Sequence, residues 1–222
     1  MNAIKSLKRS RDYRAKEDAN PKIIEADDLI FVEVRGQWVE ARQTYRQAKA
    51  AGRAASKAAD DGDALFDRTG RTWVRSVTDE EGRSLSGELA KLMDGTTPGK
   101  LFFLPYRQEL TAADLLETAL PRYPHLQGEA EKHADFSAAI VAFHPLVTAD
   151  EAATREFATK GTVFTMATAA FDRAYGKLVR NLHTFLSDEE IYAILPRFIR
   201  KGTGGGGGGG GGGTGGSGGS DT

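Results

Sequence analysis

Large and small residues follow a seven-residue repeat along the first of two long apolar patterns in the chain. Steps of seven from the first tryptophan reach Trp38, Tyr45, Gly52, Ala59, Phe66 and Trp73. The row three positions later consists of short side chains throughout: Ala41, Ala48, Ala55, Gly62, Thr69 and Ser76. A heptad row lies along one side of an α-helix, and small residues let a second helix approach closely. The pattern predicts one helix from about residue 28 to residue 77.

The acidic segment Asp60–Asp63 is the weak point of this helix. Its sequence, Asp-Asp-Gly-Asp, has low helix propensity. The heptad phase is nevertheless the same on both sides of the segment. We therefore favour a single helix, with a break at residues 60–63 as the alternative.

The second pattern is dominated by phenylalanine. Its large residues recur at heptad positions over about 50 residues, and six of the 11 phenylalanines fall on this row. Together with Tyr175 of the neighbouring row, the members are Phe136, Phe143, Phe157, Phe164, Phe171, Leu178 and Phe185. At 1.5 Å per residue, a straight helix of this length would span about 75 Å. His144-Pro145 interrupts the pattern, so the helix either kinks there or ends and restarts in phase.

The two patterns are complementary, because one is rich in alanine and glycine and the other in phenylalanine. Antiparallel packing would place aromatic rings over small residues, as in a coiled coil. Sequences of the capping-box type at Thr78, Thr111, Thr148 and Ser187 predict helix starts, with a connecting segment at residues 95–110. We expect an all-α helical bundle built on two long, heptad-patterned antiparallel helices with shorter helices around them.

Three regions follow from the composition. Residues 1–26 are predicted to form a charged, basic flexible arm, and residues 27–200 a single helical bundle domain. Residues 201–222 contain 15 of the 26 glycines, ten of them consecutive. Such a segment has no apolar surface to bury, so it is predicted to be a disordered glycine-rich tail.

Charge and cysteine content narrow the choice of function. The formal net charge of −1 gives no overall attraction to nucleic acid or anionic membranes. The absence of cysteine excludes disulfides, thiolate metal sites and a cysteine nucleophile. No apolar run approaches the ~20 residues of a membrane-spanning helix. We expect a soluble, cytoplasmic protein.

Candidate chemistry is sparse. Four aspartates, Asp60, Asp61, Asp63 and Asp67, suggest calcium, but an EF-hand loop counted from Asp60 or Asp61 lacks the required glycine and glutamate. We therefore interpret them as an acidic turn or a solvated helix face. The four histidines form no Glu-x-x-His pair, and no Gly-x-Ser-x-Gly or phosphate-binding loop occurs. The prediction is a protein without catalytic residues, metal or cofactor.

Three functions remain, in this order. The first is a non-catalytic interaction or scaffold protein that acts through a protein partner or self-assembly. The second is a nucleic-acid-associated accessory protein, in which the basic arm lies along phosphates. The cations of that arm are Lys5, Lys8, Arg9, Arg11, Arg14 and Lys16. The third is a helical bundle that binds a small apolar ligand or a metal between its helices.

Overall fold

The part of the chain that the structure describes is mostly helical. A computed structural model describes residues 12–16 and 18–195. Within these residues the backbone forms helices and turns, and the extended pairing is confined to one isolated bridge between Thr78 and Ser84. The predicted all-α fold is confirmed, whereas residues 201–222 of the predicted tail lie outside the described residues.

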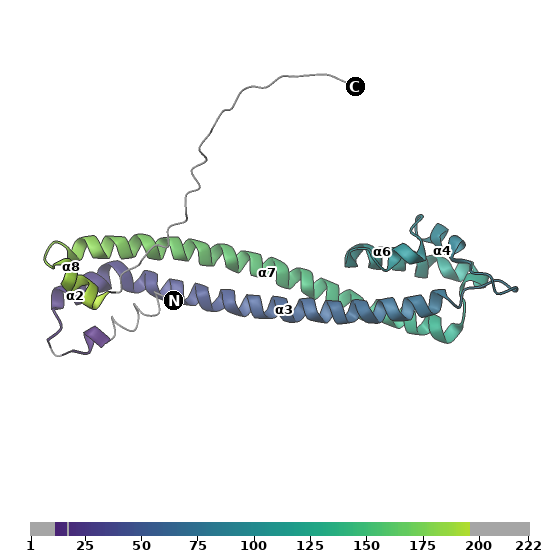
Figure 1. The fold of residues 1–222 in the computed structure, drawn as a ribbon, viewed down its shortest axis with the longest axis horizontal. Coiled ribbons are helices and arrows are strands. Elements are labelled where there is room, and N and C mark those ends of the chain that lie inside the picture. The colour runs from purple at the N-terminus through teal and green to yellow at the C-terminus, as the bar shows by residue number, and fades with distance from the viewer. Residues whose placement is uncertain (1–11, 17, 196–222) are drawn as a thin grey trace, which may run out of the picture. The chain divides into compact units, whose positions relative to one another are not determined.

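From Pro21 to Ile194, ten helical elements follow one another along the chain (Figure 1). The long ones are α3 (Glu33–Val74) and α7 (Ala130–Leu182). The shorter α-helices are α2 (Pro21–Asp27), α4 (Ser86–Leu92), α5 (Pro98–Leu101), α6 (Tyr106–Ala119) and α8 (Asp188–Ile194). A π-helix, η1 (Asp28–Val32), precedes α3, and two 3₁₀-helices, η2 (Leu120–Arg122) and η3 (Pro124–Leu126), precede α7.

The chain divides into two compact units. The larger unit is Asp28–Lys177, which contains α3 and most of α7. The smaller unit combines Met1–Asp27 with Leu178–Thr222, and its described part includes α2, the end of α7 and α8.

Aromatic contacts join α3 and α7 in the larger unit. Trp38 lies against Phe171 with ring centroids 5.5 Å apart, and Tyr45 stacks on Phe164 at 5.2 Å. Farther along α3, Trp73 stacks on Phe136 at 5.2 Å. The α7 residue numbers fall as the α3 numbers rise, so these segments run in opposite directions. Figure 1 shows the two helices side by side.

Small residues make this approach possible. A Cβ atom added to Gly70 would lie 2.5 Å from the ring of Phe102 and 2.8 Å from that of Phe136. One added to Gly62 would lie 2.6 Å from Leu146. Any larger residue at Gly70 would therefore displace an aromatic ring of the core.

A wider core forms where α4 and α6 join the two long helices. Phe66, Trp73, Phe136 and Phe143 are buried there. The shorter helices and the segments between them add the following apolar side chains: Leu89, Met93, Leu101, Leu110, Leu116 and Leu120. In Figure 1, α4 and α6 lie beside this segment of the long helices.

Both long helices continue through the positions where the sequence suggested interruptions. Helix α3 passes through Asp60–Asp63 without a break, as favoured. Helix α7 contains Pro145 within its span, so it does not end and restart there. Phe143 and Val147 are buried on either side of this proline. Packing of the apolar row therefore outweighs the hydrogen bond that proline removes.

Three of the predicted helix starts are wrong. Residues 78–85 form a turn, and α4 begins only at Ser86. Thr111 lies within α6, and Thr148 lies within α7. Their hydroxyls donate to the carbonyl oxygens four residues earlier, at 2.8 Å and 3.0 Å. A threonine inside a helix can satisfy its hydroxyl in this way, so the sequence motif alone does not define a start.

The fourth start is confirmed. Ser187 precedes α8 and accepts a hydrogen bond from the Glu190 amide, while the Glu190 carboxylate accepts one from the Ser187 amide. These reciprocal bonds form a complete capping box.

Candidate functional site

One side of α7 carries an uncharged row that reaches solvent. We call it the outer α7 face: Thr159, Val163, Met166 and Ala170, with Glu156 and Arg173 one step beyond each end. The alternating spacing of three and four residues places these positions on one side of the helix. The solvent-exposed fraction is 46% for Val163 and 67% for Met166, and Ala170 is half-buried.

The outer α7 face borders a groove that α3 and α7 line together. Val163, Met166 and Ala170 line this groove from α7 together with Lys160, and the α3 side is lined by Gln37, Glu40, Ala41 and Thr44. The face is therefore open to solvent, and small, polar and charged side chains of α3 lie beside it.

The surroundings of this face on α7 are also uncharged. No charged residue occurs from Gly161 to Phe171, although Thr162, Thr165 and Ala169 within this segment are exposed. Phe164 and Phe171 of the same segment point toward α3, where they contact Trp38. This segment of α7 is therefore uncharged on its solvent side as well as on its core side.

The charges at the ends of the outer α7 face are arranged symmetrically. Glu156 and Arg173 lie at equal distances in sequence from the point between Phe164 and Thr165. Val163 and Met166 are related by the same point, as are Thr159 and Ala170. Turning the helix end for end thus exchanges the positions of Glu156 and Arg173. Val163 and Met166 also exchange positions, so the apolar centre stays where it was.

A second feature is a group of three carboxylates between α3 and α6. Asp63 and Asp67 are one helical turn apart on α3, and Glu109 belongs to the buried side of α6. One oxygen of each side chain lies within 4.8 Å of an oxygen of the other two. Glu109 exposes only 2% of its surface, while Asp63 and Asp67 are half-buried. We call these three residues the carboxylate cluster.

One cation lies beside the carboxylate cluster. The Arg71 guanidinium donates to Asp67 Oδ2 at 3.0 Å and to the Phe102 carbonyl oxygen at 3.3 Å. On another side, the Tyr106 hydroxyl donates to Asp60 at 2.5 Å, and this bond raises the pKa of Tyr106. Burial raises the pKa of Glu109 to about 8, and a hydrogen bond from protonated Glu109 to Asp63 adds to this effect.

The chain matches no protein-family model, no curated protein and no solved structure. The candidate sites are therefore interpreted from their own chemistry. None of the helices in the described part of the chain combines the length and apolar character needed to cross a membrane.

The predicted aromatic rows occupy three environments. Among them, the buried members are Trp38, Phe66, Trp73, Phe136, Phe143, Phe171, Tyr175 and Leu178. Tyr45, Phe157 and Phe164 are half-buried, and Tyr45 stacks on both phenylalanines. Phe185 departs from the row and is 38% exposed. Helix α7 ends at Leu182, so the heptad register no longer applies at Phe185.

The basic arm is only partly described. Lys5, Lys8, Arg9 and Arg11 lie outside the described residues. Arg14 forms an ion pair with Asp27 at 2.6 Å, and the Lys16 ammonium lies 6.0 Å from the centre of the Tyr13 ring.

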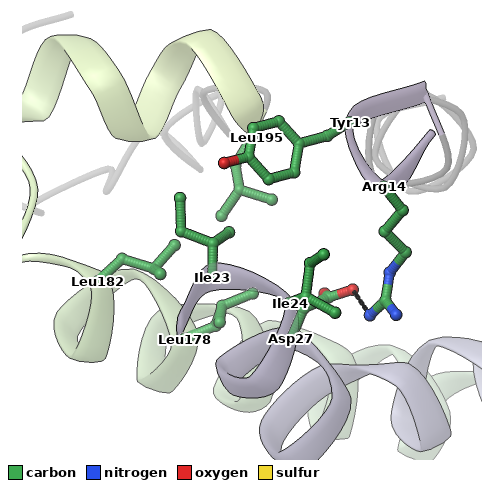
Figure 2. A pocket seen from close by; sticks show the side chains of 8 residues that line it. All are labelled: Tyr13, Arg14, Ile23, Ile24, Asp27, Leu178, Leu182 and Leu195. Atoms are coloured by element: carbon green, nitrogen blue, oxygen red, sulfur yellow. Dashed lines mark hydrogen bonds and ion pairs between the residues drawn. The ribbon is translucent and has the colours of Figure 1, made fainter. Parts of the chain in front are cut away.

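An apolar pocket in the smaller unit is too small for a ligand. Figure 2 shows Ile23, Leu178, Leu182 and Leu195 converging on it, with the Arg14–Asp27 ion pair at its edge. Its volume is about 10 Å³, at the lower limit for a single water molecule. The pocket is a packing contact within this unit and gives no support to an apolar-ligand function.

Each histidine lies beside one carboxylate. His125 is 3.2 Å from Glu88, His133 is 3.0 Å from Glu117, and His144 is 3.0 Å from Asp114. His183 is 3.4 Å from Asp188. These pairs are separate from one another and from the carboxylate cluster, and a single carboxylate beside one imidazole supplies too few ligands for a metal.

A basic row runs along α3. Arg42, Arg46, Lys49, Arg53 and Lys57 recur at steps of four, three, four and four residues, which places them on one side of the helix. Arg42 lies with its guanidinium 5.5 Å from the centre of the Trp38 ring. Lys57 pairs with Asp61 at 2.7 Å.

The interpretation of the four aspartates as an acidic turn or solvated helix face is wrong for two of them. The backbone is helical, Asp60 and Asp61 are exposed, and Asp63 and Asp67 face Glu109. The sequence did contain a signal. Glu109 occupies the apolar side of its helix, together with Leu110, Ala113 and Leu116, where a charged residue is unusual.

Proposed function

We propose that this protein is a non-catalytic helical scaffold that self-associates through the outer α7 face. The observation that carries the proposal is the exposed, uncharged row centred on Val163 and Met166, with an acidic residue at one end and a basic residue at the other. The occupant is a second copy of the chain.

Antiparallel pairing of two such faces about a two-fold axis supports this occupant. Val163 of each copy would lie opposite Met166 of the other, and Thr159 opposite Ala170. Glu156 would lie opposite Arg173 at both ends. A two-fold interface must be self-complementary in this sense, because each residue meets its symmetry-related position. Parallel pairing would instead oppose like charges.

The side chains of this face are also suitable for helix packing. Threonine and alanine are small enough for close approach, while valine and methionine supply apolar surface. Burying that surface removes it from water and stabilises the dimer. The mechanism is therefore one of assembly, in which α7 contacts α3 within one copy and α7 of the second copy through its outer face.

Sedimentation velocity of the full chain, from low to high micromolar concentration, tests the proposal. We expect a monomer–dimer equilibrium. Met166→Glu should raise the dissociation constant at least about tenfold, because it introduces charges at the centre of an apolar contact. The matched control is Thr165→Glu, which adds the same charge at an exposed neighbour on a different side of α7.

Two outcomes would overturn self-association through this face. The first is a wild-type chain that remains monomeric throughout the concentration range. The second is a dimer that Met166→Glu and Thr165→Glu weaken equally. A monomer that binds a different helical protein through Met166 would assign the same face to another occupant.

The basic row on α3 supports a second candidate function, nucleic-acid binding. Five cations on one side of a helix form a local positive surface that the net charge of the chain does not reveal. Unlike the basic arm, this row lies entirely within the described residues. Its contacts would be with phosphates, since no base-reading motif accompanies them.

Salt-dependent binding to a DNA duplex, measured by fluorescence anisotropy, tests this candidate. Replacing Arg46, Lys49 and Arg53 with glutamine should reduce the slope of log K against log salt by about 0.9 for each phosphate that the variant no longer neutralises. A control that replaces Lys91, Lys100 and Arg122 changes the net charge equally at exposed positions elsewhere. Equal weakening in both variants, or binding that ignores salt, would reject the basic row as the DNA-binding surface.

A further inference from the structure

The carboxylate cluster is distinguished by its unpaired oxygens. Among the residues that the structure describes, the buried side-chain oxygens that have no hydrogen-bond partner when all carboxylates are ionised are Asp63 Oδ1, Asp67 Oδ1 and Glu109 Oε2. All three belong to this one cluster. Buried polar atoms in proteins nearly always have a partner, and an ionised carboxylate oxygen can only accept. Three converging acceptors therefore require a common donor or a cation.

The net charge of the carboxylate cluster indicates how much positive charge a bound cation would carry. Asp63, Asp67 and Glu109 contribute three negative charges when ionised, and Arg71 contributes one positive charge. The cluster then has two uncompensated negative charges. Burial of Glu109 makes this state unfavourable unless a cation neutralises it.

A single proton on Glu109 would satisfy fewer of the three unpaired oxygens than a cation. If Glu109 is protonated, its hydroxyl donates one hydrogen bond and can satisfy one of the two aspartates. The unpaired oxygen of the other aspartate then still lacks a partner, since Arg71 contacts Asp67 at the opposite oxygen, Oδ2. A cation at the centre contacts all three oxygens at once.

We propose that Asp63, Asp67 and Glu109 bind one hard divalent cation between α3 and α6. Carboxylate oxygens are the ligands that Ca²⁺, Mg²⁺ and Mn²⁺ prefer. Calcium–oxygen distances of about 2.3–2.6 Å allow two ligands of one ion to lie up to about 5 Å apart. The separations within 4.8 Å in the cluster therefore fit a calcium-sized ion. Water completes the coordination from the half-buried side of the two aspartates.

The ion would join segments that are far apart in sequence. Its ligands come from α3 and from α6, which lies against the wider core through Leu110 and Leu116. Binding to the folded state alone raises stability by mass action, so the cation should stabilise the attachment of α6. This role is independent of the outer α7 face, since the ligands lie on α3 and α6.

Thermal unfolding of the full chain, followed by circular dichroism, tests the site. The chain is treated with EDTA, desalted, and measured alone and with Ca²⁺, Mg²⁺ or Mn²⁺ added singly. We expect at least one of these ions to raise Tm by about 5 °C at a concentration about 100-fold above its Kd. Electron paramagnetic resonance of added Mn²⁺ should then give one bound ion per chain.

Variants separate this site from non-specific stabilisation by salt. Glu109→Gln should abolish the rise in Tm while its own cation-free Tm stays close to that of the wild type, because the glutamine amide is neutral and similar in size to a carboxyl group. Asp63→Asn, at a half-buried position, is the second variant if Glu109→Gln does not fold. Asp61→Asn is the matched control: Asp61 is exposed on the same helix and pairs with Lys57, so the response should persist.

Two results would overturn the proposal. One is a wild-type chain whose Tm no divalent cation raises and which binds no Mn²⁺. The other is the same rise in Tm for wild type and Glu109→Gln. Either result would assign the cluster to a shared proton.

Discussion

Individual residues decide the local structure where the sequence pattern is ambiguous, and Asp79 is an example. The Asp79 carboxylate accepts hydrogen bonds from the amides of Glu81 and Arg83 at 3.0 Å and 2.8 Å, and from the Arg83 side chain at 2.7 Å. These bonds organise the turn in place of the predicted helix start at Thr78. The bond from the Arg83 amide is the largest cause that lowers the pKa of Asp79.

The lowered pKa predicts how the turn responds to acid. A carboxyl group whose pKa is lower in the folded state adds stability above its ordinary pKa of about 3.9, and loses it as pH falls through the lowered value. The turn should therefore remain ordered down to about pH 3.9 and lose its order only at lower pH. Amide chemical shifts of Glu81 and Arg83, followed by NMR against pH, measure this transition.

The control for this titration is Asp79→Asn, which should remove the acid transition from both amides. A midpoint at or above the ordinary value of about 3.9 would contradict the prediction. It would show that the carboxylate gains nothing from these hydrogen bonds in solution.

Helices were predicted well where a long apolar period defined them. Trp38, Phe66 and Trp73 recur on one heptad row, and α3 continues between them even through Asp60–Asp63. Across Pro145, the row from Phe136 to Phe171 likewise outweighs the local tendency to end the helix. Burial along a whole face contributes more to stability than the propensity of one short segment.

Short-range signals at helix ends were less informative. Thr111 and Ser187 have similar sequence contexts, yet only Ser187 caps a helix. The difference arises because residues outside the motif determine where the chain is already helical. Helix α6 begins at Tyr106, so Thr111 lies inside the helix, where a side chain cannot cap its N-terminus.

The carboxylate cluster shows how far a group of side chains from separate helices can be predicted from the sequence. The sequence places Asp63 and Asp67 one turn apart, but it does not reveal that Glu109 approaches them. That contact depends on how α6 packs against α3, which arises from apolar residues such as Leu110 and Leu116. The sequence alone therefore reveals the pair on α3 and the residue on α6 separately, and does not reveal that they form one cluster.

At the scale of the whole molecule, the proposed self-association would make the folded chain a subunit of a larger assembly. Glu156 and Arg173 are exposed, and each is related to the other by reversal of the helix. Antiparallel self-association would place each beside its opposite charge in the second copy, twice per dimer. Charge reversal therefore tests the direction of pairing, which Met166→Glu does not.

We predict that Glu156→Arg and Arg173→Glu each weaken the dimer by about threefold to tenfold, because each replaces two attractive contacts with two repulsive ones. The double variant restores opposite charges at both ends, so its dissociation constant should return close to that of the wild type. Asp172→Arg is the control, since it reverses an exposed charge next to Arg173 outside the outer α7 face. Sedimentation velocity at low salt gives the dissociation constant of each variant and of the wild type. Single variants that dimerise like the wild type, or a double variant weakened by the sum of both, would exclude antiparallel pairing, because only that geometry makes the two substitutions compensate each other.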